Sequence, residues 1–189
     1  MMSLDGYLEG PNHDVMAMPF DQGFDEYNAE RLRNADTLLL GRTTFERFLG
    51  YWPPIADKRD APAIEREVSR LQNAVEKVVV SDSLTAEQTA PWSDTRIVRR
   101  ADAHHEIAEL KKSAGRDIIV FGSHILWNDL LAHGLVDELH IIVGAGIVGG
   151  GTPAFESKPS ATLRLVDTAT WDGSNLVLLR YAVEVSGVA

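Results

Sequence analysis

Three short apolar runs constrain the fold of this chain more than any other feature of its sequence. They are TLLLG from Thr37, KVVVS from Lys77 and DIIVF from Asp117. Continuous apolar runs of this length are typical of strands that are buried on both faces of a sheet. The segments between them carry apolar residues at helical spacing, as in Ile64 to Leu71. Strands that alternate with helices predict a largely parallel sheet with helices on both faces.

The same alternation runs through most of the chain. Further helices are expected at residues 24–35, 43–49, 104–113 and 125–133, and further strands at residues 95–98 and 138–143. Thr43 followed three residues later by Glu46 is a capping-box signature for a helix start. We expect loops at residues 50–62, which hold three prolines, and at residues 144–158, which hold five glycines.

The C-terminal part has a different pattern. Residues 161–171 and 176–185 are two strand-like runs joined through Asp172-Gly173, a turn signal, and they predict an antiparallel hairpin. The predicted architecture is therefore an α/β three-layer sandwich with a mostly parallel mixed sheet and a C-terminal antiparallel hairpin. The length of 189 residues and the absence of repeats predict a single domain over residues 1–189.

Composition excludes several classes of function. Lysine and arginine number 18 against 28 acidic residues, and a net charge of −10 argues against nucleic acid as a partner. The chain has no cysteine, which excludes disulfides, thiolate zinc sites and cysteine nucleophiles. Six histidines occur, but the adjacent His104 and His105 have no acidic or histidine partner at metal-ligand spacing, so no metal site is expected. No apolar run approaches the roughly 20 residues of a membrane span, and the start MMSLDGYLEG lacks signal-peptide features, so the expected location is the cytoplasm.

Three strand-to-helix junctions are candidate ligand sites, because ligands of open α/β sheets bind beyond the carboxyl ends of strands. The junctions are Gly41-Arg42-Thr43, Gly122-Ser123 and Ser81-Asp82-Ser83. At each one, a plain turn without ligand is the alternative. Two glycine junctions in one sheet favour a long ligand with several negative charges, such as a dinucleotide. The GxGxxG fingerprint is absent, so the chain does not have the ordinary Rossmann site.

Several motifs in order resemble one known family. They are SLDGYLEGP near the start, LLGRTTFE from Leu39, KVVVS, DIIVFGS, and HGLVDELHIIV from His133. Together they resemble the dihydrofolate reductase-like proteins that share the fold of the reductase half of the riboflavin-biosynthesis deaminase-reductase. The resemblance covers nearly the whole chain. It implies an NADPH-dependent reductase of a small heterocyclic substrate that forms a homodimer, whereas the zinc deaminase half, which needs cysteines, is absent.

The resemblance also implies roles for individual residues. The Gly41-Arg42-Thr43 junction would hold the phosphates of NADPH, and Ser81 would lie near the adenosine ribose with its 2′-phosphate. The Gly122-Ser123 junction would take the pyrophosphate and nicotinamide side. The implied cofactor-binding residues are Gly41, Arg42, Thr43, Ser81, Gly122 and Ser123. Asp5 in the SLDG stretch is the candidate catalytic carboxylate, and a turn-forming aspartate before Gly6 is the alternative.

Some positions differ from the family pattern. At Asp82 the carboxylate is expected to repel a 2′-phosphate, so the preference for NADPH over NADH depends on Arg42. The segment TTFERFLGYWPP does not reproduce the acidic, proline-containing segment of the riboflavin reductases. A pteridine or dihydrofolate-type reductase, or a nucleotide-binding module without catalysis, is therefore an alternative. Only Met1 and Met2 precede SLDG, where the family usually has a strand, and we expect the natural product to start upstream.

Overall fold

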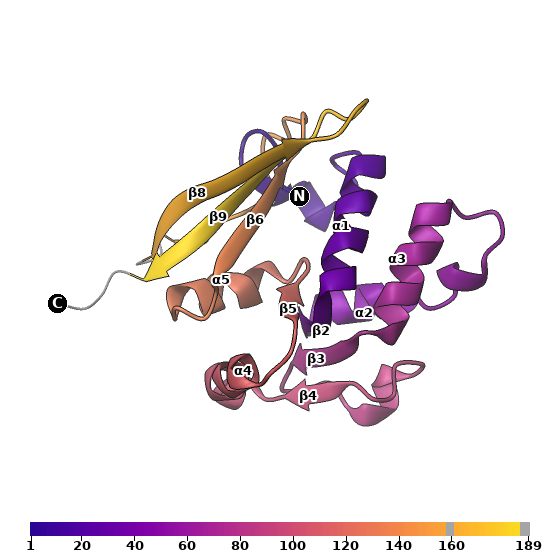
Figure 1. Ribbon diagram of the computed structural model, residues 1–189, viewed down its shortest axis with the longest axis vertical. Coiled ribbons are helices and arrows are strands. Elements are labelled where there is room, and N and C mark those ends of the chain that lie inside the picture. Colours follow the sequence, from indigo (N-terminus) through magenta and orange to yellow (C-terminus); the bar gives the residue numbers. More distant parts are fainter. Residues whose placement is uncertain (158–160, 186–189) are drawn as a thin grey trace. The chain divides into compact units, whose positions relative to one another are not determined.

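The computed structural model describes residues 1–157 and 161–185, and the chain divides into two compact units (Figure 1). Unit 1 comprises Met1–Phe24 and Asn128–Ala189, and unit 2 comprises Asp25–Trp127. The unit boundaries fall inside two helices, α1 (Gln22–Asn34) and α5 (His124–Ala132). The single domain expected over residues 1–189 stays a prediction. In the described ranges, no helix combines the length and apolarity needed to cross a bilayer.

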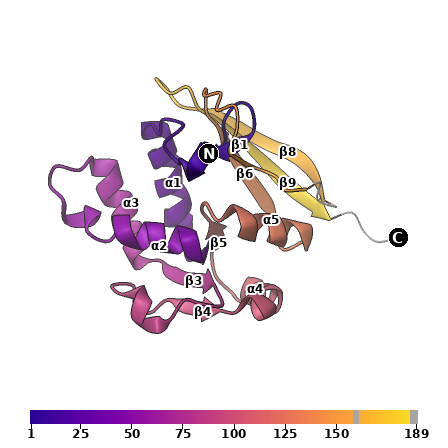
Figure 2. The same ribbon diagram turned by 180° about the vertical axis from the view of Figure 1, so that it is seen from behind.

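Unit 2 is built on a parallel sheet of four strands, seen from opposite sides in Figures 1 and 2. Its strands are β2 (Ala35–Gly41), β3 (Glu76–Val80), β4 (Arg96–Val98) and β5 (Asp117–Val120), in the order β4-β3-β2-β5. Its other helices are α2 (Arg42–Tyr51), α3 (Ala63–Ala74) and α4 (Ala103–Lys112). The predicted alternation of strands and helices is confirmed here.

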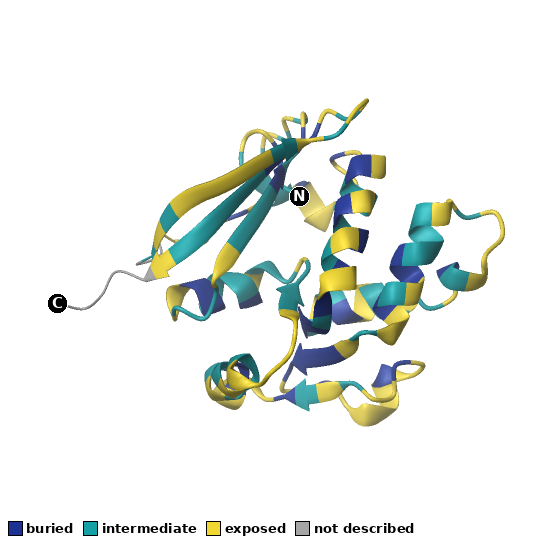
Figure 3. Ribbon diagram, in the orientation of Figure 1, coloured by how far each residue is buried: buried dark blue, intermediate teal, exposed yellow. Residues whose placement is uncertain are grey.

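The apolar runs form the core of unit 2. Leu38 and Leu40 point to one face of β2, because side chains alternate along a strand, and they pack with Phe45 of α2 and with Trp92. Leu39 points to the other face and is equally buried. Burial on both faces explains why the run is continuously apolar, and Figure 3 shows the buried residues concentrated on β2 and β3.

Unit 1 contains an antiparallel sheet of β6 (Glu138–Val143), β8 (Ala161–Thr170) and β9 (Val177–Val185), in the order β6-β9-β8. The predicted hairpin is confirmed, and Gly173 in its turn has a φ of +76°, which glycine adopts without strain. The segment expected as a parallel strand, β6, instead pairs antiparallel with β9. The α/β class is confirmed, while the strands divide among separate parallel and antiparallel sheets.

A third pairing in unit 1 involves two strands that the sequence analysis did not predict. The strand β1 (Tyr7–Glu9) pairs antiparallel with β7 (Thr152–Pro153). Four 3-10 helices complete the described elements: Pro11–His13, Ile55–Asp57, Ala86–Thr89 and Arg100–Asp102.

Met2 makes strand-like contacts beside β6. Its N–H donates to the carbonyl of Ile142 at 2.7 Å, and its own carbonyl accepts from the N–H of Gly144 at 2.8 Å. These bonds form a parallel bridge at the place where the sequence analysis expects a longer strand. A start upstream of Met1 stays a prediction.

Lys77 is a charged residue inside the core of unit 2, with an exposed fraction of 5%. Its ammonium group donates to the carbonyl of Asn73 at 3.0 Å and lies 4.6 Å from the centre of the Trp92 ring. Burial lowers the pKa of Lys77 from 10.5 to about 8, with Asp94 opposing this shift. Burial of the charged form therefore costs folding free energy at neutral pH.

The pH dependence of stability tests this cost. Between about pH 8 and pH 10.5 the unfolded chain keeps a proton on Lys77 that the folded chain has lost, so stability rises with pH. We expect Lys77→Met to remove a slope of up to about 1.4 kcal/mol per pH unit. Urea unfolding at several pH values measures the difference between wild type and variant. Lys112→Met, at a side chain that is 70% exposed, is the control, and a pH-independent difference for Lys77→Met would contradict the prediction.

Candidate functional site

The carboxyl ends of the four parallel strands in unit 2 form one edge of the sheet. The register aligns Gly41 with Val80 and Val80 with Val98, so the residues that follow β2, β3 and β4 lie side by side. On the other side of β2, Leu39 is aligned with Val120 of β5. The three junctions identified in the sequence thus lie on a common edge, as parallel pairing requires.

Ser123 joins two of these junctions. The N–H of Gly41 donates to Oγ of Ser123 at 3.0 Å, and the N–H of Ser123 donates to Oγ1 of Thr44 at 3.0 Å. Gly122 has a φ of +56°, and a Cβ there would lie 3.0 Å from Cγ2 of Thr44. Glycine is therefore required for both backbone conformation and space. The N–H groups of Gly41 and Ser123 were expected to bind an anion, but both already have partners within the chain. These two residues therefore stabilise the carboxyl edge of the sheet.

Arg42 begins α2 at the end of β2. The predicted capping box of Thr43 and Glu46 does not form, because the helix starts one residue earlier with Gly41 as its N-cap and without a side-chain cap. Glu46 instead accepts a hydrogen bond from Nε of Arg42 at 2.7 Å. Nη1 of Arg42 donates to Oγ of Ser83, which places the guanidinium between the ends of β2 and β3. Thr43 is exposed at this edge.

The side chain of Ser81 faces inward. Ser81 is 2% exposed, and its Oγ accepts hydrogen bonds from the N–H groups of Ser83 at 3.2 Å and Leu84 at 3.0 Å. Its hydroxyl thus shapes the turn after β3. Contact of Ser81 with a ribose stays a prediction.

Two arginines that the sequence analysis did not single out follow β4 directly. Arg99 donates from Nη1 to the carbonyl of Asp82. Arg100 donates its N–H to Oδ1 of Asp82 at 3.0 Å, and its Nε lies 3.7 Å from Oδ2. The Asp82 carboxylate, expected to repel a phosphate, is therefore paired with a cation. The sequence RIVRR could have indicated these two arginines, because residues that directly follow a parallel strand lie at the carboxyl edge of the sheet.

Asp5 belongs to unit 1, where it holds the glycine-rich loop. Its Oδ1 accepts from the N–H of Val148 at 3.1 Å, and its Oδ2 accepts from the N–H of Gly149 at 2.8 Å. A neighbouring backbone hydrogen bond also supports the loop, because the N–H of Leu4 donates to the carbonyl of Gly146 at 2.8 Å. Two successive N–H groups on one carboxylate form the kind of concavity that binds an anion, and the chain's own Asp5 fills it.

Hydrogen bonds determine the protonation state of the Asp5 carboxyl group. Hydrogen bonds from Ser3, Gly149 and Val148 favour the ionised form and lower the pKa of Asp5 from 3.8 to about 2. At neutral pH the carboxylate is ionised and has no proton to donate. Its catalytic role stays a prediction, and the geometry favours action through the loop.

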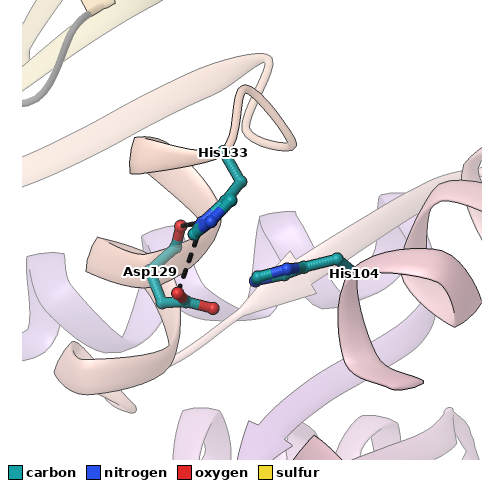
Figure 4. A group of neighbouring side chains, drawn as sticks. All are labelled: His104, Asp129 and His133. Atoms are coloured by element: carbon teal, nitrogen blue, oxygen red, sulfur yellow. Dashed lines mark hydrogen bonds and ion pairs between the residues drawn. The ribbon is translucent and has the colours of Figure 1, made fainter. Parts of the chain in front are cut away.

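A histidine and an aspartate side chain lie close together on α5. Nδ1 of His133 lies 3.3 Å from Oδ1 of Asp129, one helical turn away (Figure 4). His104, also drawn in Figure 4, belongs to α4 in unit 2. The pair on α5 offers two ligands, fewer than the three or four protein ligands of a zinc site.

Comparisons with known proteins agree on one family. The family model described as the RibD C-terminal domain matches residues 1–179. The uncharacterized protein YyaP of Bacillus subtilis (strain 168) is 30% identical over 184 residues, covering 95% of this chain and 90% of YyaP.

Two solved structures show the same fold. A putative riboflavin biosynthesis protein from Shewanella sp. PV-4 has 23% identity and a TM-score of 0.69, with 97% of this chain and 95% of that chain covered. A dihydrofolate reductase from Enterococcus faecalis, complexed with NADP(H), has 15% identity and a TM-score of 0.60, with 96% and 92% covered. The fold of this chain is therefore dihydrofolate reductase-like.

The bond between Ser123 and Thr44 can be tested by substitution. Thr44→Val keeps the side-chain shape and removes the acceptor of the Ser123 N–H, so we expect the free energy of unfolding to fall by about 1–3 kcal/mol. Urea unfolding measures this change. Thr43→Val, at the exposed neighbouring position, should change stability by less than about 0.5 kcal/mol. Equal effects at both positions would show that the bond is unimportant.

The contact of Asp5 with the loop is tested by amide hydrogen exchange. Asp5→Ala removes both acceptor oxygens, so we expect the amides of Val148 and Gly149 to exchange faster than in the wild type. Asp5→Asn retains one acceptor oxygen and should give an intermediate rate. Asp172→Ala in the β8–β9 turn is the control, and unchanged exchange in Asp5→Ala would rule out the contact.

Proposed function

Because this chain belongs to the RibD C-terminal domain family, we propose that it is an NADPH-dependent reductase that transfers a hydride to a small heterocyclic substrate. The activity that this chain resembles is 5-amino-6-(5-phosphoribosylamino)uracil reductase, which is named for one structural neighbour, a deaminase/reductase from Thermotoga maritima. The proposal assigns cofactor binding to unit 2, and in unit 1 it concerns Asp5 and the loop that Asp5 holds.

One observation carries the proposal: three arginines gather at the carboxyl edge of the sheet in an otherwise acidic chain. Arg42 contacts Ser83, while Arg99 and Arg100 contact Asp82, so the three cations surround the same turn after β3. A chain with a net charge of −10 gains from such a cluster where an anionic ligand binds. The cluster fits a ligand with several phosphates.

The residues of this edge suit the parts of NADPH. The start of α2 at Gly41, Arg42 and Thr43 would hold phosphate oxygens, which favour a helix N-terminus and a guanidinium. Gly122 and Ser123 would border the pyrophosphate, where the backbone lacks a Cβ. Arg99 and Arg42, which contact Asp82 and Ser83 just after Ser81, would take the 2′-phosphate. Since Asp82 is paired with Arg100, its charge is compensated and does not oppose this phosphate.

The chemistry required of the protein is positioning. NADPH, when bound, supplies a hydride to an electrophilic carbon of a C=N or C=O group. The protein must hold the two reacting faces roughly 3 to 3.5 Å apart and exclude water. The ionised Asp5 would contribute by fixing the loop at Val148 and Gly149, and the proton that completes the reduction would come from another group or from water.

Substitution of the arginines tests the recognition of the 2′-phosphate. We expect Arg42→Ala and Arg99→Ala each to weaken NADPH binding by about 1–3 kcal/mol, the range for hydrogen bonds to a charged group, and to change NADH binding less. Isothermal titration calorimetry measures both cofactors. Arg116→Ala, just before β5 at the amino edge of the sheet, is the control. Equal losses for NADPH and NADH would show that these arginines do not recognise the 2′-phosphate.

The activity itself is tested in two steps. Thermal shift with NADPH, NADH and FMN reports which cofactor binds. The absorbance of NADPH is then followed with the ribosylaminopyrimidine substrate, pterins, dihydrofolate, flavins and simple carbonyl compounds. Turnover of the ribosylaminopyrimidine supports the proposal in full. Turnover of pterins or dihydrofolate alone supports an NADPH-dependent reductase with a different substrate from the one proposed. Binding of NADPH without turnover of any of these compounds would show that the chain is a nucleotide-binding module without catalysis. Absence of NADPH binding would overturn the proposal.

A further inference from the structure

Asp82 connects the segments that follow two neighbouring strands of unit 2. The strands β3 and β4 lie side by side in the parallel sheet (Figure 1). Where they end, the N–H of Ser81 donates to the carbonyl of Val98 at 2.9 Å. Directly beyond this bond, Asp82 contacts Arg99 through its backbone and Arg100 through its side chain. One residue thus makes two connections between the segments after β3 and β4.

The side chain of Asp82 fixes the backbone of the segment after β4. Its Oδ1 accepts a hydrogen bond from the N–H of Arg100 at 3.0 Å. Arg100 is the first residue of a 3-10 helix, and the N-cap of this helix, Arg99, makes no side-chain cap. Asp82 therefore supplies, from the neighbouring segment, the acceptor that a capping side chain normally provides.

The backbone of Asp82 orients the guanidinium of Arg99, because its carbonyl accepts a hydrogen bond from Nη1 of Arg99. The turn that carries this carbonyl is itself constrained. Oγ of Ser81 accepts from the N–H of Ser83 at 3.2 Å, and Oγ of Ser83 accepts from Nη1 of Arg42. A guanidinium has five N–H donors, so the bond to Asp82 uses only one of those that Arg99 can offer to a ligand.

Charge alone predicts that loss of the Asp82 carboxylate improves the binding of an anion. The carboxylate compensates the charge of Arg100, and its removal would leave this cation without that partner. The effect is small, because the Arg100 and Asp82 side chains are 77% and 58% exposed and water screens their charges. The hydrogen bond to the Arg100 backbone acts in the opposite direction, because it reduces the conformational freedom that Arg99 loses when a ligand binds.

We propose that Asp82 is a positioning residue that increases the selectivity of this edge for a ligand with a 2′-phosphate. It holds the segment that carries Arg99 and so preorganises a guanidinium for the phosphate. This gain exceeds the attraction that an unpaired Arg100 would add. The inference rests on the proposed binding of NADPH, and it assigns a favourable role to a residue whose charge alone predicts the reverse.

Substitutions of Asp82 distinguish positioning from charge, because the two predict changes of opposite sign. Isothermal titration calorimetry of the full chain compares NADPH with NADH, and 2′,5′-ADP with 5′-AMP, which lacks the 2′-phosphate. We expect Asp82→Ala to raise the dissociation constants of NADPH and 2′,5′-ADP about tenfold, and those of NADH and 5′-AMP less than about twofold. Asp82→Asn keeps one acceptor oxygen for the Arg100 N–H and should give an intermediate loss. Asp117→Ala is the matched control, because it removes the same charge from the exposed start of β5 at the amino edge.

Two further measurements show whether Asp82 acts through the segment that it holds. In a chain that already carries Arg99→Ala, we expect Asp82→Ala to change the dissociation constant of NADPH by less than about twofold. The amide of Arg100 should exchange its hydrogen faster in Asp82→Ala than in the wild type or in Asp117→Ala. Thermal unfolding of each variant verifies that it is folded.

The outcomes separate this inference from the proposed function. If the wild type binds neither NADPH nor 2′,5′-ADP, both are overturned. If the wild type binds NADPH, the positioning role alone is overturned by equal or tighter binding of NADPH to Asp82→Ala, or by equal losses for NADPH and NADH. A tenfold loss that persists in the Arg99→Ala background, or unchanged exchange of the Arg100 amide, also overturns it.

Discussion

Two hydrogen bonds made by Ser123 hold the carboxyl edge of the parallel sheet together. In one, Oγ of Ser123 accepts from the N–H of Gly41 at the end of β2, and in the other, the N–H of Ser123 donates to Oγ1 of Thr44 on α2. Both bonds require the chain to turn sharply after β5, which Gly122 permits with its positive φ. Every residue proposed to bind the cofactor in unit 2 lies on the edge that these bonds fix, so the geometry of the site depends on them.

Charge at this edge is organised by pairing. Asp82 neutralises Arg100 and orients the turn that Arg99 and Arg42 also contact. The cluster leaves an excess of positive charge, because three guanidinium groups face two carboxylates, Asp82 and Glu46. In unit 1 the opposite arrangement is found, since the ionised Asp5 fills a concavity of backbone N–H groups. Unit 2 thus has an excess of positive charge at its edge, whereas in unit 1 the chain's own carboxylate holds a loop.

Much of the fold could be predicted from the sequence, because buried strands and amphipathic helices leave periodic patterns. The site was predicted in part. The glycines at positions 41 and 122 were identified, whereas Arg99 and Arg100 were missed, since their importance arises from the pairing of β4 with β3. The capping box predicted at Thr43 does not form because α2 begins at Arg42 with Gly41 as its N-cap, and Glu46 accepts from Arg42 instead. The same pattern at Thr85 and Gln88 does form a capping box.

The sequence by itself determined most of the strands and helices, the turn of the C-terminal hairpin and the family to which the chain belongs, because local periodicity and ordered motifs encode these properties. Only the tertiary structure decided that β6 pairs antiparallel with β9, that Asp82 pairs with Arg100, and that Asp5 binds the loop at Val148 and Gly149. These features depend on contacts between residues far apart in the chain, and such contacts leave no periodic signal in a single sequence.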